Sequence, residues 1–509
     1  MAGMCPDLGG EFHKKKTSMK RQSDEYDVTV LGSGLGGLIA AALLSYHNHN
    51  VLLLKESSYH PFHVKDGYRF VPFSNFSERR LNLTLVQKVS HLLNLSSLTR
   101  DREDARKVEA KSEKPSQKVA FQVILPKARI DIFCHRSMLQ MEWRREFPKE
   151  LSRIENFYHE MDRTQSLLKK MKPQGSWPVF PPRALPWIKR WLSFQSLPKE
   201  TIDEKLSSFS REFKEFVQLQ LISWGNLYSG RFPFSLATYP LLSEEVEKWI
   251  PDIDAEKLAE SIFEKFFQSG GNIEEIERVE KVEIGWWKPR FTLTLKGDKK
   301  TIRSKFLILN SPLHHLSQCL GKRGRLLSKW KEKIRPRYVL LPVFLGMDEK
   351  VIPVGMRDLL VSILNLDKPY EGGNVLFLSL SQKGNEAVAP AGKRGLTVES
   401  LIPIGKWDQG SLNEHLEDVM RHLHHLFPFL EKYLEFTDWS WAHRQLSCWS
   451  YPHFLYETRG DLQWEKEVVP QRISKNLYFV GKENFPYLGL EGEILSGYLV
   501  GKQILEKHG

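Results

Sequence analysis

The segment Asp27–Leu44 constrains the fold of this 509-residue chain more than any other. An apolar run, Val28–Leu31, precedes three glycines, and an Ala- and Leu-rich run follows them. Gly32, Gly34 and Gly37 have the G-x-G-x-x-G spacing of a dinucleotide-binding βαβ unit. In such a unit the first glycine permits a sharp turn, the second lets a pyrophosphate approach, and the third lets helix and strand pack closely. The helix presents free N–H groups and its positive dipole end to the phosphates.

A second apolar segment, Val51–Leu54, supports a Rossmann-type unit over a Gly-rich turn in an ordinary α/β domain. The second strand of such a unit usually ends with an acid that binds the adenosine ribose. Here Lys55 comes first and Glu56 second. Successive strand side chains point to opposite faces. Lys55 at the usual position therefore turns Glu56 away, unless the strand end bulges.

The composition fits a globular protein of two or three domains, with 41% hydrophobic and 27% charged residues. The net charge of +12 suits anionic lipid, nucleic acid or an acidic partner, or reflects surface lysine alone. Because no zinc-finger spacing or RNA-binding aromatic motif occurs, we expect no nucleic acid partner. Four scattered cysteines without a C-x-x-C pattern fit a reducing compartment and argue against a disulfide framework. The oligomeric state stays open.

Two segments bear on location. Residues 1–24 are polar and basic without an apolar core, which predicts a disordered tail rather than a secretory signal. No uninterrupted transmembrane run occurs, so we expect a cytoplasmic protein. Residues 177–194 interleave tryptophan and phenylalanine with arginine and lysine, which suits peripheral contact with a membrane surface. The alternative for this stretch is a Pro-rich connector that leads into a partly buried helix.

Periodicity predicts the remaining elements. Helices are expected over 139–170, 206–221, 258–267, 407–433 and 492–506. Strands are expected over 119–125, 128–133, 282–284, 290–295, 306–309, 339–345, 375–380, 396–401 and 477–480. No internal repeat is present.

The order and spacing of the segments from Glu25 to Glu506 resemble those of the flavin-dependent oxidoreductases of the phytoene desaturase, carotenoid isomerase and retinol saturase group. The glycine loop is one point of resemblance. Three more follow: Phe306–His315 is similar to a buried strand that ends in an Asn-Ala-Asp-Pro type turn, Ala387–Gly392 to a small-Pro-x-Gly turn, and Leu477–Gly497 to the C-terminal flavin motif. Within that motif lie Gly481, Pro486, Gly489, Gly492 and Ser496-Gly497.

The resemblance implies an α/β fold with a Rossmann-type FAD-binding domain interleaved with an α+β substrate domain. Residues 25–75, 240–330 and 470–509 would form the first domain, and residues 76–239 and 331–469 the second. The implied cofactor is FAD. The residues implied to bind it are Gly32, Ser33, Gly34, Leu35, Gly36, Gly37, Lys55, Glu56, Gly481, Lys482, Glu483, Gly489, Leu490 and Gly492.

The implied reaction is hydride exchange between flavin and an apolar polyene, carotenoid, retinoid or related lipid, giving desaturation, saturation or isomerisation. Such chemistry belongs mostly to the cofactor, and no catalytic residue is identified. No nucleophile triad is present. We expect His415, His422, His424 and His425 to be solvated helix residues, with a metal site as the alternative that we do not favour. His314 and His315 lie at the family turn and are expected to be structural.

The chain departs from the family pattern in three places. Pro61-Phe62-His63 stands where the family has Gly-Gly-Arg, and Val71–Ser74 replaces an Asp-x-Gly-Pro segment. Lys482, followed by Glu483, replaces an acid. Lysines can meet phosphate oxygens as point charges. The same changes equally indicate a weakened or lost flavin site. The alternatives are then a lipid- or isoprenoid-binding protein, as Rab escort proteins and GDP-dissociation inhibitors of related architecture are, or a subunit that keeps the fold for assembly.

Overall fold

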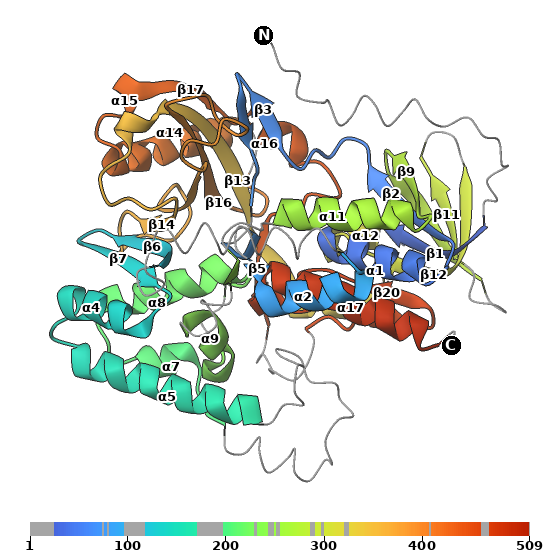
Figure 1. The fold of residues 1–509 in the computed structure, drawn as a ribbon, viewed down its shortest axis with the longest axis horizontal. Helices are drawn as coiled ribbons and strands as arrows, with labels where there is room; N and C mark the ends of the chain where they lie inside the picture. The colour runs from blue at the N-terminus through green and yellow to red at the C-terminus, as the bar shows by residue number, and fades with distance from the viewer. Residues whose placement is uncertain are drawn as a thin grey trace.

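Two eight-stranded sheets organise the described part of the chain, and Figure 1 shows them in different halves of the molecule. The computed structural model describes residues 25–73, 76–78, 81–95, 118–170, 197–228, 232–242, 249–250, 255–285, 291–296, 300–319, 325–406, 409–459 and 468–507.

The first sheet is built around β1 (Glu25–Leu31), which pairs in parallel with the next strand, β2, and with the distant strand β12. Val28 lies opposite Phe306 on one side and Val51 on the other. The strand order is β10-β11-β12-β1-β2-β9, with β20 beside β12 and β19 beside β20. Most residues of the central strands are buried, as expected of parallel strands covered on both faces. The other strands of this sheet are β2 (Val51–Glu56), β9 (Asn272–Ile276), β10 (Val279–Ile284), β11 (Phe291–Leu295), β12 (Thr301–Leu309), β19 (Arg472–Ser474) and β20 (Leu477–Phe479).

The second sheet has the order β17-β13-β16-β15-β14-β6-β7, with β18 also paired to β13. Its longest pairing joins β13 to β16 without a break, from Tyr338 opposite Pro403 to Asp348 opposite Lys393. The strands are β6 (Val119–Leu125), β7 (Ala128–Phe133), β13 (Ile334–Asp348), β14 (Leu359–Ile363), β15 (Val375–Leu380), β16 (Lys393–Pro403), β17 (Leu434–Asp438) and β18 (Phe454–Thr458). Two small pairings accompany the sheets: β3 (His63–Lys65) with β4 (Tyr68–Phe70), and β5 (Leu81–Asn82) with β8 (Trp249–Ile250).

Helix α1 (Leu35–Tyr46) begins directly at the glycine loop and is buried from Leu35 to Ser45. A helix that is apolar on all sides needs cover on all sides. It contacts α2 (Leu83–Leu93), α11 (Ala255–Gln268) and α17 (Leu490–Leu505), and Figure 1 shows all four beside the first sheet. The crossing of α1 and α17 is close, since a Cβ on Gly497 would lie 2.1 Å from the Gly36 carbonyl oxygen.

The other helices belong mostly to the second half of the molecule. In Figure 1, α4, α5, α7, α8 and α9 gather on one side of the second sheet, and α14 and α15 lie on the other. Their bounds are α4 (Arg136–Glu146), α5 (Leu151–Lys170), α7 (Ile202–Leu206), α8 (Arg211–Trp224), α9 (Phe234–Leu241), α14 (Gln409–Leu426) and α15 (Leu430–Tyr433). Shorter elements are α12 (Leu313–Cys319), α13 (Arg325–Lys333), α16 (Ser440–Gln445), η2 (Phe76–Glu78), η5 (Glu349–Val351) and η6 (Pro486–Leu488).

The predicted α/β class with a Rossmann-type unit is confirmed by the parallel strands around β1 and the helix that follows them. Three helix predictions were wrong in extent. The helix expected over 139–170 is two helices, α4 and α5, because the chain turns at Phe147–Glu150, which includes Pro148. The helix expected over 206–221 is α7 and α8, with Ser210 capping the second. The helix expected over 407–433 is α14 and α15.

Two of the histidines expected to be solvated are buried between α14 and the second sheet. His415 Nε2 lies 2.8 Å from Ser400 Oγ, and His422 Nε2 lies 2.9 Å from Ser362 Oγ. Burial lowers the pKa of each imidazole to about 4, so both remain neutral at pH 7. That expectation was wrong for these two because they share the face of α14 that packs on the sheet.

Among the described residues, no helix is long and apolar enough to cross a membrane. The stretch 177–194, predicted to contact a membrane surface, lies outside the described residues, and so does the predicted basic tail at 1–24.

Candidate functional site

A cavity of about 430 Å³ opens where the glycine loop meets α11 and the start of α17. This volume is in the range of small-molecule sites. It lies at the carboxyl ends of the parallel strands, where ligands bind in open α/β sheets. Of the predicted site residues, those on its wall are Ser33, Gly34, Leu35, Lys55, Gly481, Lys482, Glu483 and Leu490. Those that are not part of the wall are Gly32, Gly36, Gly37, Glu56, Gly489 and Gly492.

Asn310 explains why the loop needs its glycines. Its backbone N–H donates to the Leu31 carbonyl at 2.7 Å, and its side-chain Nδ2 donates to the Val480 carbonyl at 2.9 Å. Asn310 thereby joins the ends of β1, β12 and β20. A Cβ on Gly32 would lie 1.8 Å from the Asn310 carbonyl oxygen, and a Cβ on Gly37 would lie 2.4 Å from Asn310 Oδ1. The loop is therefore shaped by close backbone and side-chain contact within the chain.

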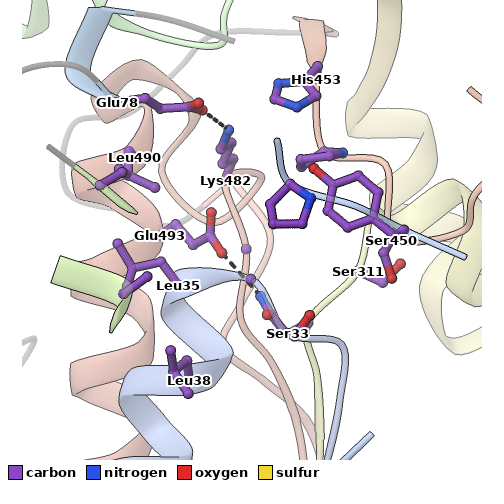
Figure 2. Close-up of a pocket in the computed structure, with 18 of the residues that line it drawn as sticks. Ser33, Leu35, Leu38, Glu78, Ser311, Ser450, His453, Lys482, Leu490 and Glu493 are labelled. Carbon is purple, nitrogen blue, oxygen red and sulfur yellow. Dashed lines mark hydrogen bonds and ion pairs between the residues drawn. The ribbon is translucent and has the colours of Figure 1, made fainter. Parts of the chain in front are cut away.

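The side chain of Glu493, a residue of α17, lies at the start of α1. Its Oε1 accepts a hydrogen bond from the Gly36 N–H at 3.2 Å and lies 3.4 Å from Asn310 Nδ2. Figure 2 shows the carboxylate between the two helices, directed toward the loop at Ser33. Gly36 lies in the first turn of α1, where backbone N–H groups have no partner within the helix. A carboxylate is favourable there because it faces the positive end of the helix dipole.

Lys55 and Glu56 point to opposite sides, as strand alternation predicts. Lys55 lines the cavity, and its Nζ lies 3.2 Å from Glu275. Glu56 is buried away from the cavity and accepts hydrogen bonds from the backbone N–H groups of Trp449 at 3.2 Å and Ser450 at 2.7 Å. The ribose-binding position of the strand therefore presents a lysine to the cavity.

The segment that replaces Gly-Gly-Arg gives the cavity an apolar wall. Pro61 and Phe62 line the cavity, and the Arg69 guanidinium carbon lies 4.7 Å from the centre of the Phe62 ring. His63 instead bonds Asp438 at 3.1 Å in the second half of the molecule. Side chains therefore stand where glycine would leave backbone open to a ligand.

The loop after β20 carries a buried ion pair and a buried acid. Lys482 pairs with Glu78 of η2, and the two side chains are only 6% and 12% exposed. Figure 2 shows Lys482 directed at Glu78 across the cavity wall. Glu483 accepts hydrogen bonds from the Leu313 N–H and the Tyr456 hydroxyl, each at 3.0 Å. Burial raises the pKa of Glu483 to about 7, against these hydrogen bonds, which lower it.

The first residues of α17 also contact other parts of the chain. Gly489 has φ +57° before the helix, and the Leu490 N–H donates to Ser77 Oγ at 3.0 Å. A Cβ on Gly492 would lie 2.5 Å from the Phe485 carbonyl oxygen, so this glycine serves contact with the preceding loop.

Sequence reasoning missed several groups that shape the cavity. Asn310 was noted only as part of a turn, and Glu78, Tyr456 and Glu493 were not singled out. The signal for Asn310 was a polar residue at the end of a buried strand; for Glu493 it was an acid in the first helical turn after Gly489. The cavity is lined by five carboxylates against two lysines: Glu78, Glu256, Glu260, Glu483 and Glu493, with Lys55 and Lys482.

Several solved structures of similar fold are oxidoreductases by name. An oxidoreductase from Methanosarcina mazei aligns with a TM-score of 0.56 and 16% identity, over 94% of this chain and 100% of its own. Cyclohexylamine oxidase from Brevibacterium oxydans aligns with a TM-score of 0.55 and 13% identity, over 95% and 99%. Putrescine oxidase aligns with a TM-score of 0.57 and 14% identity, over 95% and 99%. At these identities the likeness shows the fold. No curated protein matches the sequence.

A protein-family model matches the sequence and shows the family of this chain. The model described as "Flavin containing amine oxidoreductase" matches residues 123–505, which is most of the chain. The match begins within β6 and covers the rest of the second sheet, the helices around it and the C-terminal motif. It implies FAD as the cofactor, in agreement with the prediction from the glycine loop and the C-terminal motif. The chain belongs to the flavin-containing amine oxidoreductase family.

Proposed function

We propose that this protein is an FAD-dependent oxidoreductase of the phytoene desaturase, carotenoid isomerase and retinol saturase type, which acts on an apolar polyene or related lipid. The observation that carries the proposal is the cavity, which unites the glycine loop with the C-terminal motif. Its walls include apolar side chains from α1, α11, α17 and the segment after β2: Leu35, Leu38, Phe62, Phe263 and Leu490. Such walls favour an apolar ligand over a polar one.

The residues present fit FAD in part. Gly32 has φ +108° and Gly34 forms the N-cap of α1, so the loop has the conformation that brings phosphates to a helix start. Lys55 would place a cation on the nucleotide side of the cavity. When bound, FAD would supply the hydride acceptor or donor. The chain's own contribution is to hold the ring and exclude water with its apolar wall.

An amine is the competing substrate class. Two of the similar structures are oxidases of cyclohexylamine and putrescine by name. The five carboxylates around the cavity would attract a cation. A polyene and an amine are therefore best compared side by side in one assay.

A second candidate function is binding without redox chemistry. The observation that favours it is that the chain's own side chains take N–H groups at the starts of three helices: Glu493 at α1, Ser77 at α17 and Glu483 at α12. In this case the cavity would hold a lipid or isoprenoid, or the fold would serve assembly with a partner.

Flavin content separates the two functions. We expect the purified protein, after incubation with FAD and gel filtration, to keep the visible absorption of bound flavin and to release FAD on denaturation. Polyenes should then reoxidise the reduced flavin, or their saturated counterparts should bleach the oxidised flavin, under anaerobic conditions. Putrescine and cyclohexylamine serve as the comparison. Reaction with the amines alone would replace the proposed substrate class, and a protein that never retains flavin would leave only the binding function.

We also propose peripheral contact with a membrane surface through residues 177–194, which would let an apolar substrate pass from a bilayer to the cavity. The wild-type protein should co-sediment with vesicles that contain anionic lipid, more at low salt than at high salt, because of its +12 charge. The double variant Trp187→Ser, Trp191→Ser should lose this binding. Equal sedimentation of both proteins would exclude this segment as the contact.

A further inference from the structure

We propose that the Glu493 carboxylate competes with the dinucleotide phosphates for the start of α1, and so determines how tightly this protein holds its cofactor. The inference rests on the FAD cofactor of the proposed function. It concerns a residue of this chain that the glycine motif does not include.

The carboxylate bonds a backbone N–H in the first turn of α1, at the end of the glycine loop. Its Oε1 accepts from the Gly36 N–H at 3.2 Å, and a Cβ on Gly34 would lie only 2.5 Å from the same oxygen. Glu493 is therefore in contact with the loop that would cradle the pyrophosphate. Glu493 lines the cavity and Gly36 does not, so the carboxylate stands between the cavity and this N–H, which phosphates at the helix start would otherwise attract. The two anions cannot share one donor, so Glu493 has to turn away when a phosphate binds.

Electrostatics adds to the competition. The side chain is 6% exposed, so solvent screens it poorly from a nearby phosphate. Like charges brought together in such a place repel each other strongly. The two lysines of the cavity are each engaged by another acid, Lys55 by Glu275 and Lys482 by Glu78.

In the protein without cofactor the same contact is favourable. The carboxylate satisfies an N–H in the first turn of α1, and it links α17 to the loop. Glu493 should therefore raise the stability of the empty protein while it lowers the affinity for the dinucleotide. A residue that only supports the fold would move both quantities in the same direction.

The test compares Glu493→Gln and Glu493→Ala with wild type and with Glu491→Gln. Glu491 is a matched control because it lies in the same turn of α17, is also buried, and accepts a hydrogen bond from the Tyr239 hydroxyl of α9. Binding of FAD, ADP and riboflavin to the cofactor-free proteins is measured by calorimetry. FAD and ADP carry the pyrophosphate, and riboflavin does not. We expect both Glu493 variants to bind FAD and ADP about tenfold more tightly, with riboflavin unchanged and Glu491→Gln no tighter than wild type.

Stability of the empty protein gives a readout that is independent of binding. Glu493→Ala should lower its melting temperature by roughly 1–2 °C, since it removes a helix cap from a chain of this size. Unchanged or weaker binding of FAD and ADP in both Glu493 variants would overturn the proposal, and so would an equal gain in Glu491→Gln or a gain for riboflavin. If the variants bind more tightly but no substrate reacts, the proposed function fails and the role of Glu493 stands.

Discussion

Gly32→Ala should leave almost no folded protein. Gly32 has φ +108°, a region that residues with a side chain rarely adopt, and a Cβ there would lie 1.8 Å from the Asn310 carbonyl oxygen. To avoid this collision, the end of β1 would have to move away from the end of β12. The two strand ends are joined by the hydrogen bond from the Asn310 N–H to the Leu31 carbonyl, which would break. We expect a loss of more than about 4 kcal/mol in the free energy of unfolding, measured by urea unfolding, or insoluble expression.

Gly270→Ala is the matched control for this prediction. Gly270 follows α11 with φ +81°, and a Cβ there would have no atom within 4 Å. It carries a similar backbone strain without the collision, so we expect a loss of only about 1–2 kcal/mol. If the two variants are equally stable, the loop is not held against Asn310 in solution.

Glu483→Gln should stabilise the cofactor-free protein at alkaline pH. The pKa of Glu483 is raised from 4.5 to about 7 by burial, so the folded state binds a proton more tightly than the unfolded chain. The resulting loss of stability begins as the pH rises above about 4.5 and is complete above about 7. Glutamine keeps an oxygen for the Leu313 N–H and the Tyr456 hydroxyl but cannot ionise. We expect a gain of up to about 3 kcal/mol at pH 8 and little change at pH 4.5.

The measurement is thermal or urea unfolding of wild type and variant across this pH range. Glu435→Gln provides a control of opposite sign, because the hydrogen bond from Lys393 is the first cause of the lowered pKa of Glu435. That variant should lose stability near neutral pH rather than gain it. A pH-independent difference between Glu483→Gln and wild type would show that Glu483 does not titrate in this window.

Local patterns in the sequence were sufficient to predict the central β1–α1–β2 unit. Alternation along one strand was enough to separate Lys55 from Glu56, and the glycine spacing located the start of α1 at Leu35. These features depend on neighbours within a few residues, where steric rules act directly. The turn at Pro148 and the capping residue Ser210 were also local signals, and giving them more weight would have divided the long helices correctly.

The contacts that define the cavity could not be derived in the same way. Glu493 meets Gly36 across 457 residues, and Lys482 meets Glu78 across 404. Nothing near either acid indicates its partner, since any acid in a first helical turn is favourable by its own helix dipole. The burial of His415 and His422 depends on which face of α14 packs on the second sheet. The apolar residues near them indicate an amphipathic helix but not the orientation of that helix on the sheet.

The crossing of α1 with α17 has a consequence during synthesis of the chain. Helix α1 leaves the ribosome about 450 residues before the segment that covers it, Leu490–Leu505. At about 5–20 residues per second, this interval is roughly 25–90 s. During that time the Ala- and Leu-rich face of α1 that α17 will cover stays open, and β20 is not yet beside β12. We therefore expect α2 and α11, or a chaperone, to cover this face of α1 until α17 has been made.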